Sequence, residues 1–432
     1  MRLHQIPQRT HFDVAIVTYD VVIVRLRFRA AMSRVCRLAL LVGLIVIGPA
    51  RAKEGDVLNV GVGVTVTYDD NLLRLPNGVN PAAVGAPTDS RSSLVTNGFV
   101  RFILDVPISR QRIRADFTIN SSHYSEGYSY LDFTGWEGSA QWLYQLGNNW
   151  KGDAYYRRTD QPAGFADYRN FRSQNIQTSN AFGINTDYLL TRSWRLSGGA
   201  NYTQARNSSP SARYSDLDQW WTEAGIKYES SESNYLRATG RYTAGQYPDR
   251  LLPTASTDTD FTQYDLAFDG NWQLSAATRA YGRIAYTNRR FPNSAIRSFS
   301  GPTWRVQLDW APTIKTGVNF LFRREIGATD DITATYVLTQ GPRISPYWLI
   351  STKVRLDIYY DYVSRDYEGE PVVFSGAPPI EDRYQYAGLG FTWTPTTNLL
   401  LRAGYRYGTR SSNYPTRLFD DNSAYGTVQF LF

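Results

Sequence analysis

The sequence predicts an all-β protein: a single antiparallel transmembrane β-barrel of about 16–18 strands, with short periplasmic turns and longer extracellular loops. Three observations support this prediction: segments in which apolar and polar residues alternate, a regular array of hairpins, and charged residues in mid-strand positions. Successive side chains of a strand point to opposite faces, so alternation gives each segment one apolar and one polar face. In a membrane barrel the apolar face contacts lipid and the polar face lines a lumen.

The composition excludes several other classes of protein. The chain has 432 residues, of which 42% are hydrophobic and 20% are charged, and its net charge is +7. Residues 1–52 hold eight Arg and two Asp, which leaves 38 basic and 37 acidic residues in 53–432. A nearly neutral body without a basic run argues against nucleic-acid binding.

Residues 32–52 have the pattern of a secretory signal peptide. Arg34 and Arg37 form a positive start, and Leu38–Ile47 is an apolar run of ten residues that is followed by a small-x-small cleavage site. A run of this length is too short to span a bilayer comfortably, so we expect cleavage after Ala52.

Residues 1–31 do not fit in front of such a leader. We interpret them as a non-native upstream extension, with translation starting at Met32. The only cysteine, Cys36, leaves with the leader, so residues 53–432 contain no thiol. Export without cysteine suits the envelope of a Gram-negative bacterium, and we expect an outer-membrane location.

The clearest strand opens the mature chain. In Asn59–Tyr68, NVGVGVTVTY, every second residue is Val or Tyr, and Asn, Gly and Thr lie between them. A long loop rich in Pro, Gly, Ala and Ser follows, about 69–92. Eight hairpins and a closing strand, Ala424–Phe432, bring the predicted number of strands to eighteen.

The two kinds of connection predict the polarity of the barrel. The longer loops are rich in Gly, Pro, Ser, Asn and Asp, as in 161–173, 206–217, 246–258 and 364–380. The short turns are predicted at 107–110, 147–149, 191–193, 230–234, 275–278, 311–315, 345–347 and 394–398. Tight turns at one end and long loops at the other are typical of outer-membrane barrels.

Aromatic residues near the strand ends favour a membrane barrel over an exported soluble sandwich or solenoid. Tyr144 and Trp150 flank one short turn, and Tyr188 and Trp194 flank another. Trp and Tyr form girdles where lipid meets water. Two packed sheets could not bury the many charged residues of the opposite parity, whereas a wet lumen accepts them.

Two features link the chain to a known family. The final strand ends on Phe432, with Phe430 and Val428 at the same parity, which resembles the insertion signal of outer-membrane barrels. The segment TYDDNLLRLPNG (67–78) and the turn Trp393–Asn398 resemble the EpsL-type outer-membrane β-barrels (β-barrel porin 2-like proteins) encoded in exopolysaccharide loci alongside exosortase systems.

The resemblance implies a protein that takes part in export of extracellular polysaccharide. It implies several partners: outer-membrane lipid and lipopolysaccharide, a polysaccharide chain, and periplasmic or inner-membrane export proteins. Two alternatives stay open from the residues alone. One is a general diffusion porin for small solutes, and the other is a plugged barrel that acts as an envelope scaffold and recruits other secretion components.

The polar parity is the predicted working surface of such a conduit. Arg offers bidentate hydrogen bonds to carboxylates and vicinal oxygens, and Tyr rings stack weakly on sugars. Alternatively, Arg and Asp simply pair across strands and hold the lumen in shape. The predicted lumen-lining residues are Arg101, Arg114, Asp116, Arg157, Arg195, Arg237, Arg241, Arg283, Arg305, Arg323, Arg355, Asp357, Arg402, Arg406, Tyr155, Tyr235, Tyr281 and Tyr359, and Tyr384 and Tyr386 share their parity.

Four carboxylates are expected at the rim of the seam where the first and last strands meet. Asp69 and Asp70 end the first strand, and Asp420 and Asp421 begin the last. These carboxylates would repel one another unless water or a hard cation such as Ca²⁺ separated them. The other interpretation is that Asp and Asn serve there as turn residues.

No residues of the mature chain form a recognisable catalytic or metal site. His123 is the only histidine left after leader removal and is expected in a short loop without a hydrolase motif around it. Zinc would need several His or Cys ligands, and no Gly-rich phosphate loop precedes a helix. The many Asp and Glu residues of the loops leave glycoside hydrolysis by paired carboxylates open, but no pair can be nominated. We therefore expect no enzyme activity, no cofactor and no metal.

Overall fold

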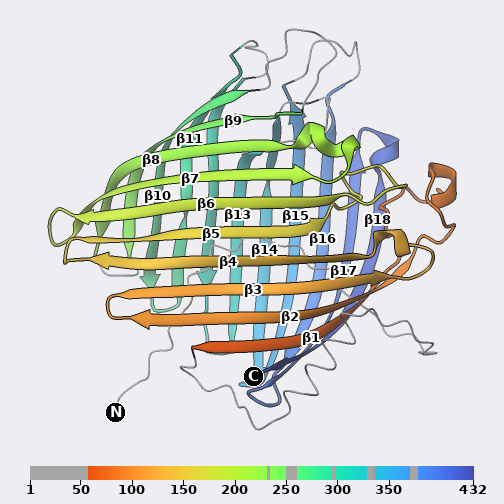
Figure 1. Cartoon of the computed structure of the whole chain (residues 1–432), viewed down its shortest axis with the longest axis horizontal. Helices are drawn as coiled ribbons and strands as arrows, with labels where there is room; N and C mark the ends of the chain where they lie inside the picture. The colour runs from red at the N-terminus through yellow and green to blue at the C-terminus, as the bar shows by residue number, and fades with distance from the viewer. Residues whose placement is uncertain are drawn as a thin grey trace.

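The computed structural model describes residues 57–230, 234–249, 260–292, 298–327, 334, 336–369 and 378–432. The predicted leader and the upstream segment 1–31 lie outside these ranges. Within them, eighteen antiparallel strands form one sheet that closes on itself, because β1 pairs with β18 (Figure 1). The barrel predicted from the sequence is confirmed.

The strands are 12 to 16 residues long, enough for tilted strands to cross a bilayer. Their bounds are β1 Leu58–Asp69, β2 Ser93–Ile108, β3 Gln111–Tyr124, β4 Phe133–Leu146, β5 Trp150–Pro162, β6 Ile176–Leu189, β7 Trp194–Asn207, β8 Leu217–Glu229, β9 Tyr235–Gln246, β10 Phe261–Ser275, β11 Thr278–Arg290, β12 Phe299–Trp310, β13 Thr316–Gly327, β14 Tyr336–Ser351, β15 Val354–Glu368, β16 Glu381–Trp393, β17 Leu399–Ser412 and β18 Phe419–Leu431.

Large apolar side chains on alternate residues of these strands are exposed. On neighbouring strands, Leu266 is 73% exposed, Phe268 53% and Ile284 55%. A soluble monomer rarely exposes a contiguous apolar band of this kind, whereas a lipid-facing surface requires one. The outward parity is therefore the lipid face.

Tryptophan and tyrosine gather on this face near the short turns. The ring of Trp150 lies 4.9 Å from that of Tyr188, and the ring of Trp194 lies 5.2 Å from that of Tyr228. Both tryptophans remain more than 40% exposed. Such rings suit the boundary between the bilayer core and the headgroups, so they mark the periplasmic edge of the membrane.

The longer connections lie at the opposite, outer end and contain short 3-10 helices. The described ones are η1 Pro81–Val84, η2 Ser129–Leu131, η3 Pro210–Ser215 and η5 Pro415–Arg417. Among the described residues, no helix is long and apolar enough to cross a membrane.

One predicted turn is wrong. Residues 345–347 lie inside β14, and the chain turns instead between Ser351 and Val354. Pro346 misled the prediction, because proline usually marks a turn or a strand edge. Pro346 and Pro342 both pair with β13, but neither has a registered partner on β15, so β14 tolerates the missing N–H groups on that side.

Candidate functional site

Ion pairs between strands that are not neighbours show which face points into the barrel. Lys151 Nζ on β5 lies 2.8 Å from Glu229 Oε1 on β8, although two strands separate them. Such a contact has to pass through the interior of a closed barrel. The register between neighbouring strands then assigns every residue of the same parity to this inner face.

The predicted lumen-lining residues all share the inner parity. Their positions follow strand by strand from the register that starts at Lys151. Several are brought together with acids: Arg101 with Asp116, Arg355 with Asp357 at 2.6 Å, and Arg305 with Glu325 at 2.9 Å. The role of these residues in transport stays a prediction.

A network of five charged side chains spans four strands on the inner face. Glu223 on β8 lies 3.0 Å from Arg237 and 2.6 Å from Arg241 on β9. Asp269 on β10 lies 2.9 Å from Arg237 and 3.5 Å from Arg283 on β11. We call these five residues the central ion-pair network. Three guanidiniums face these two carboxylates, and Asp265 stands opposite Arg241 in the register of β9 and β10, so the charges of this part of the wall are close to balance.

Tyrosines of the inner face lie against the wall. A Cβ on Gly388 would lie 2.5 Å from the ring of Tyr359, its partner in register, so only glycine fits beneath that ring. The guanidinium of Arg343 lies 4.7 Å from the ring of Tyr359, and that of Arg157 lies 5.6 Å from the ring of Tyr155. Arginine therefore covers part of the aromatic surface that was expected to stack on sugars.

The four-carboxylate cluster predicted at the seam does not form. Asp69 and Asp421 lie on the inner face, while Asp70 and Asp420 lie on the outward face, because adjacent residues of a strand alternate. On the outward side, Asp70 accepts hydrogen bonds from Asn422, at 2.7 Å from its backbone N and 2.8 Å from Nδ2. A shared cation has no place in this arrangement.

Arginines balance the two inward carboxylates of the seam. Arg74, from the loop after β1, donates to both carboxylate oxygens of Asp69, at 2.7 and 2.6 Å, and its Nη2 lies 3.5 Å from Asp421. Arg406 on β17 also pairs with Asp421. All four side chains are less than one-tenth exposed, which makes this a buried ion-pair cluster.

Three loops fold together at the outer end, which sequence patterns did not predict. The connections 70–92, 125–132 and 163–175 form what we call the outer cap. Tyr130 Oη donates to the carbonyl of Phe171 at 2.8 Å, and burial raises the pKa of Tyr130 to about 12. The cap has its own small apolar core, made of Leu73, Leu75, Ala86, Tyr128, Leu131, Phe165 and Phe171.

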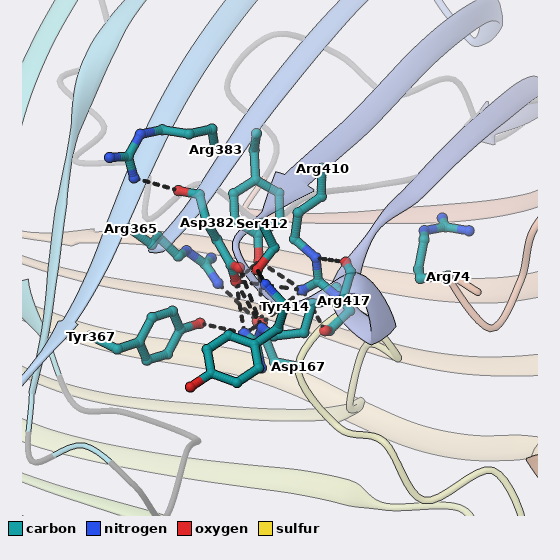
Figure 2. Close-up of polar contacts among 12 residues, drawn as sticks. Arg74, Asp167, Arg365, Tyr367, Asp382, Arg383, Arg410, Ser412, Tyr414 and Arg417 are labelled. Atoms are coloured by element: carbon teal, nitrogen blue, oxygen red, sulfur yellow. Dashed lines mark hydrogen bonds and ion pairs between the residues drawn. The ribbon is translucent and has the colours of Figure 1, made fainter. Parts of the chain in front are cut away.

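The third cap loop reaches across to strands on the far side of the seam. Asp167 lies between residues of β15, β16, β17 and η5 (Figure 2). Its Oδ2 lies 2.9 Å from Arg365 Nη1, and its Oδ1 lies 3.7 Å from Arg410 Nη1 and 4.0 Å from Arg417 Nη2. Tyr384 Oη donates to the same Oδ1 at 3.3 Å. We call Arg365, Arg410 and Arg417 the arginine site.

A second carboxylate, Asp382 on β16, completes the arginine site from below the loop. Arg417 Nη2 donates to Asp382 Oδ2 at 2.7 Å, and Arg410 Nη1 lies 3.8 Å from the same oxygen. The side chains of Arg410 and Asp382 are fully buried. Arg410 Nη2 has no hydrogen-bond partner, which is costly for a buried charged group.

The loop groups at this site have displaced pKa values. Burial alone would raise the pKa of Asp167, but the charges of Arg365, Arg410 and Arg417 outweigh it and hold that pKa below its ordinary value of 3.8. Burial and the same positive surroundings lower the pKa of Arg169 to about 10. The loop therefore carries a stabilised anion and a disfavoured cation.

The structure places His123 beside a carboxylate. His123 lies at the end of β3, not in a loop as predicted, and its Nδ1 is 2.6 Å from Asp132 Oδ2. Over the part of the chain that the structure describes, no group of three His, Cys, Asp or Glu residues could hold a metal ion.

The most closely packed polar sites were missed by sequence reasoning. Glu223, Asp269, Asp167 and Asp382 are not among the predicted lumen residues. Glu223 and Asp269 stand at inward parity, so a complete listing by parity would have found them. Asp167 lies in a loop, where only the unusual apolar neighbours of that loop signalled a buried position.

Comparison with known proteins agrees with the fold. Residues 271–432, from β10 to the end of β18, match the family described as Putative beta-barrel porin 2. No curated protein sequence matches the chain. Taken with the closed barrel and its lipid face, the family match makes the chain a porin-like β-barrel of the Gram-negative outer membrane.

Three solved porin structures follow a similar path at low identity. Acinetobacter baumannii OccAB3 is 11% identical, with 87% of this chain and 99% of that chain covered and a TM-score of 0.47. The BenF-like porin of Pseudomonas fluorescens Pf-5 is 11% identical, with 87% of this chain and 98% of that chain covered and a TM-score of 0.47. Pseudomonas aeruginosa OccK2 (OpdF) in complex with glucuronate is 9% identical, with 87% of this chain and 98% of that chain covered and a TM-score of 0.48.

Proposed function

We propose that this barrel is a hydrophilic conduit that takes part in export of extracellular polysaccharide. The observation that carries the proposal is the inner face, where charged and polar residues follow one another around the barrel while the lipid face stays apolar. The family resemblance of residues 67–78 supports polysaccharide as the cargo. A polymer rich in hydroxyl groups can exchange hydrogen bonds along such a wall without tight binding.

The guanidinium groups supply the most suitable contacts for this cargo. Arg355 lies over Tyr347 at 4.5 Å and Arg343 over Tyr359 at 4.7 Å, so these arginines lie along the wall with part of their hydrogen-bonding edge available. A planar guanidinium donates to two oxygens at once, which matches vicinal hydroxyls and carboxylates.

A second candidate is a diffusion porin for small solutes. The outer cap favours it, because three loops packed around one apolar core cover part of the outer end. If the cap closed the lumen completely, the barrel would serve instead as an envelope scaffold. In that case its periplasmic turns would recruit periplasmic or inner-membrane export proteins.

Two experiments separate these functions. Single-channel recording of the purified barrel in planar bilayers is expected to show conductance steps, and their complete absence would leave only the scaffold. Deletion of the gene is then expected to remove surface polysaccharide while uptake of small sugars and amino acids stays unchanged. Loss of small-solute uptake with normal surface polysaccharide would replace the export proposal by the diffusion porin.

A further inference from the structure

The contacts of Asp167 are those of a bound ligand more than those of a structural residue. Its carboxylate comes from a loop, and the groups around it come from four other elements. Only the contact with Arg365 is a short ion pair, at 2.9 Å, and the side chain of Asp167 remains 26% exposed. Water therefore reaches a carboxylate that three arginines surround.

One donor of the arginine site has no acceptor. Three guanidiniums face Asp167 and Asp382, and Arg169 adds a further positive charge beside them. The fully buried Arg410 aims Nη1 at the carbonyl of Ala166, at 2.6 Å, while its Nη2 has no partner. A buried guanidinium with an unused nitrogen, beside three further guanidiniums, marks a site that can accept an anion from outside.

We propose that the arginine site binds the carboxylate of an acidic sugar, and that Asp167 occupies it when the outer cap is closed. The arriving carboxylate takes the contacts with Arg365, Arg410 and Arg417, and the loop 163–175 lifts from β15–β17. This inference rests on the proposed function, since it names an acidic polysaccharide as the cargo and the cap as the element that the cargo moves.

The remaining anchors of the loop allow such a movement. Phe165 and Phe171 pack within the cap, against residues of the other two cap loops, and not against β15–β17. On the β15–β17 side, Ala166 packs beside Tyr384 and Phe419, and two hydrogen bonds hold the loop: Arg410 Nη1 donates to the carbonyl of Ala166 and Arg169 Nη2 to that of Thr416, both at 2.6 Å. Lifting the loop therefore breaks the contacts of Asp167, these two hydrogen bonds and one alanine contact, while the apolar core of the cap stays intact.

A thiol at Ala166 reports the position of the loop directly. Residues 53–432 contain no cysteine, so Ala166→Cys introduces a single reactive group into the mature chain. In proteoliposomes, galacturonate is expected to accelerate labelling by a polar maleimide at least about fivefold. Galactose, or sodium chloride at equal ionic strength, is expected to leave the rate unchanged. An equal acceleration by either control, or none by galacturonate, would overturn the proposal.

Removal of the internal carboxylate tests the site itself. Asp167→Ala leaves the arginines without their loop partner, so galacturonate is expected to bind at least about tenfold more tightly than to the original chain by calorimetry. Asp160→Ala is the matched control, because it removes a carboxylate that pairs with Arg158 elsewhere on β5, and it is expected to change nothing. Unchanged affinity in Asp167→Ala would overturn the site.

Labelling and conductance together distinguish failure of the arginine site from failure of the conduit. If galacturonate accelerates labelling while bilayers show no conductance, the arginine site stands and the proposed conduit falls. If the barrel conducts and labelling does not respond, the conduit stands and the displacement of Asp167 is rejected. Arg365→Gln is a third test of the site. In the Asp167→Ala background it is expected to weaken galacturonate binding at least about fivefold. Unchanged binding in that background would overturn the site.

Discussion

Arg74 donates two hydrogen bonds to the carboxylate of Asp69, and this buried pair ties the first loop to the seam of the barrel. Arg74→Met would leave Asp69 without its main partner and would remove one of two cations near Asp421. Breaking a buried pair from one side costs about 3–5 kcal/mol. We expect a large fall in the temperature at which the folded band disappears on semi-native gels.

The control for this prediction is an exposed pair of the same type. Arg112 lies 2.5 Å from Asp105, with 46% and 33% of the two side chains exposed. Exposed pairs contribute about 0–1 kcal/mol, so Arg112→Met should hardly change the melting temperature. Equal losses in the two variants would contradict the buried character of the Asp69–Arg74 pair.

Two adjacent residues on β3 test which face meets lipid. Ile119 is 37% exposed on the outward face, and Thr118 lies beside Arg101 on the inner face. Ile119→Arg should destabilise the barrel by about 2–4 kcal/mol, because it places a charge in hydrocarbon. Thr118→Arg should be tolerated, since Glu137 lies opposite it on β4. Urea titration in lipid vesicles measures the free energy of unfolding of both variants. If Thr118→Arg were the more destabilised, the assignment of the lipid face and the inner face would be reversed.

Acid should release the third cap loop. The groups that face Asp167 are Arg365, Tyr384, Arg410 and Arg417, and they hold its pKa below 3.8 in the closed form. A lowered pKa means that the contact stabilises the closed cap fully above that ordinary value, and that this stabilisation is lost as the pH falls further. Protection of a thiol at position 166, measured as its labelling rate relative to a free thiol at the same pH, should therefore weaken as the pH falls below about 4.

The comparison variant for this titration is Asp167→Asn. Without an ionisable group at this position, the thiol should be labelled as fast as a free thiol at neutral pH, and its rate should follow that of the free thiol as the pH falls, because the thiolate is the reacting form. Continued protection of the thiol in Asp167→Asn at neutral pH would show that the loop is held by other contacts.

Neutralising Glu223 should alter both stability and ion selectivity. Glu223 lies within 4 Å of Arg237, Arg241 and Arg283. In Glu223→Gln, these arginines lose a charged acceptor, which costs about 1–3 kcal/mol of folding stability. The loss of one negative charge from the wall should move the reversal potential in a potassium chloride gradient toward chloride.

A carboxylate outside the lumen serves as the selectivity control. Asp160 pairs with Arg158 at 3.0 Å on the outward side of β5. Asp160→Asn removes the same charge from the protein and should leave the reversal potential unchanged. A shift of equal size in both variants would mean that total charge, and not the central ion-pair network, sets selectivity.

The strands could be predicted from the sequence because their pattern is local. The contrast between Val and its Gly or Thr neighbours in Asn59–Tyr68 depends only on lipid and water lying on opposite sides of one strand. The same parity rule placed the lumen candidates and would have placed Glu223. The prediction of turns failed at Pro346, because proline usually marks a turn but here lies inside β14.

The outer cap and the seam could not be predicted in the same way. Asp69 and Asp421 are 352 positions apart, and only the closed barrel shows that Arg74 and Arg406 lie between or beside them. Asp167 meets its arginines only after a loop has crossed several strands. The sole sequence signal was the presence of Phe165 and Phe171 in a connection where polar residues are usual.

The hydrogen bond between Thr65 and Thr427 joins positions 362 residues apart, and it lies on the last pair of strands to be matched. Until β18 has left the export machinery, β1 has no antiparallel neighbour on that side, and its unpaired backbone groups are open to any passing strand. Contacts of such long range form slowly. We therefore expect a product cut short before β18 to aggregate instead of entering the bilayer.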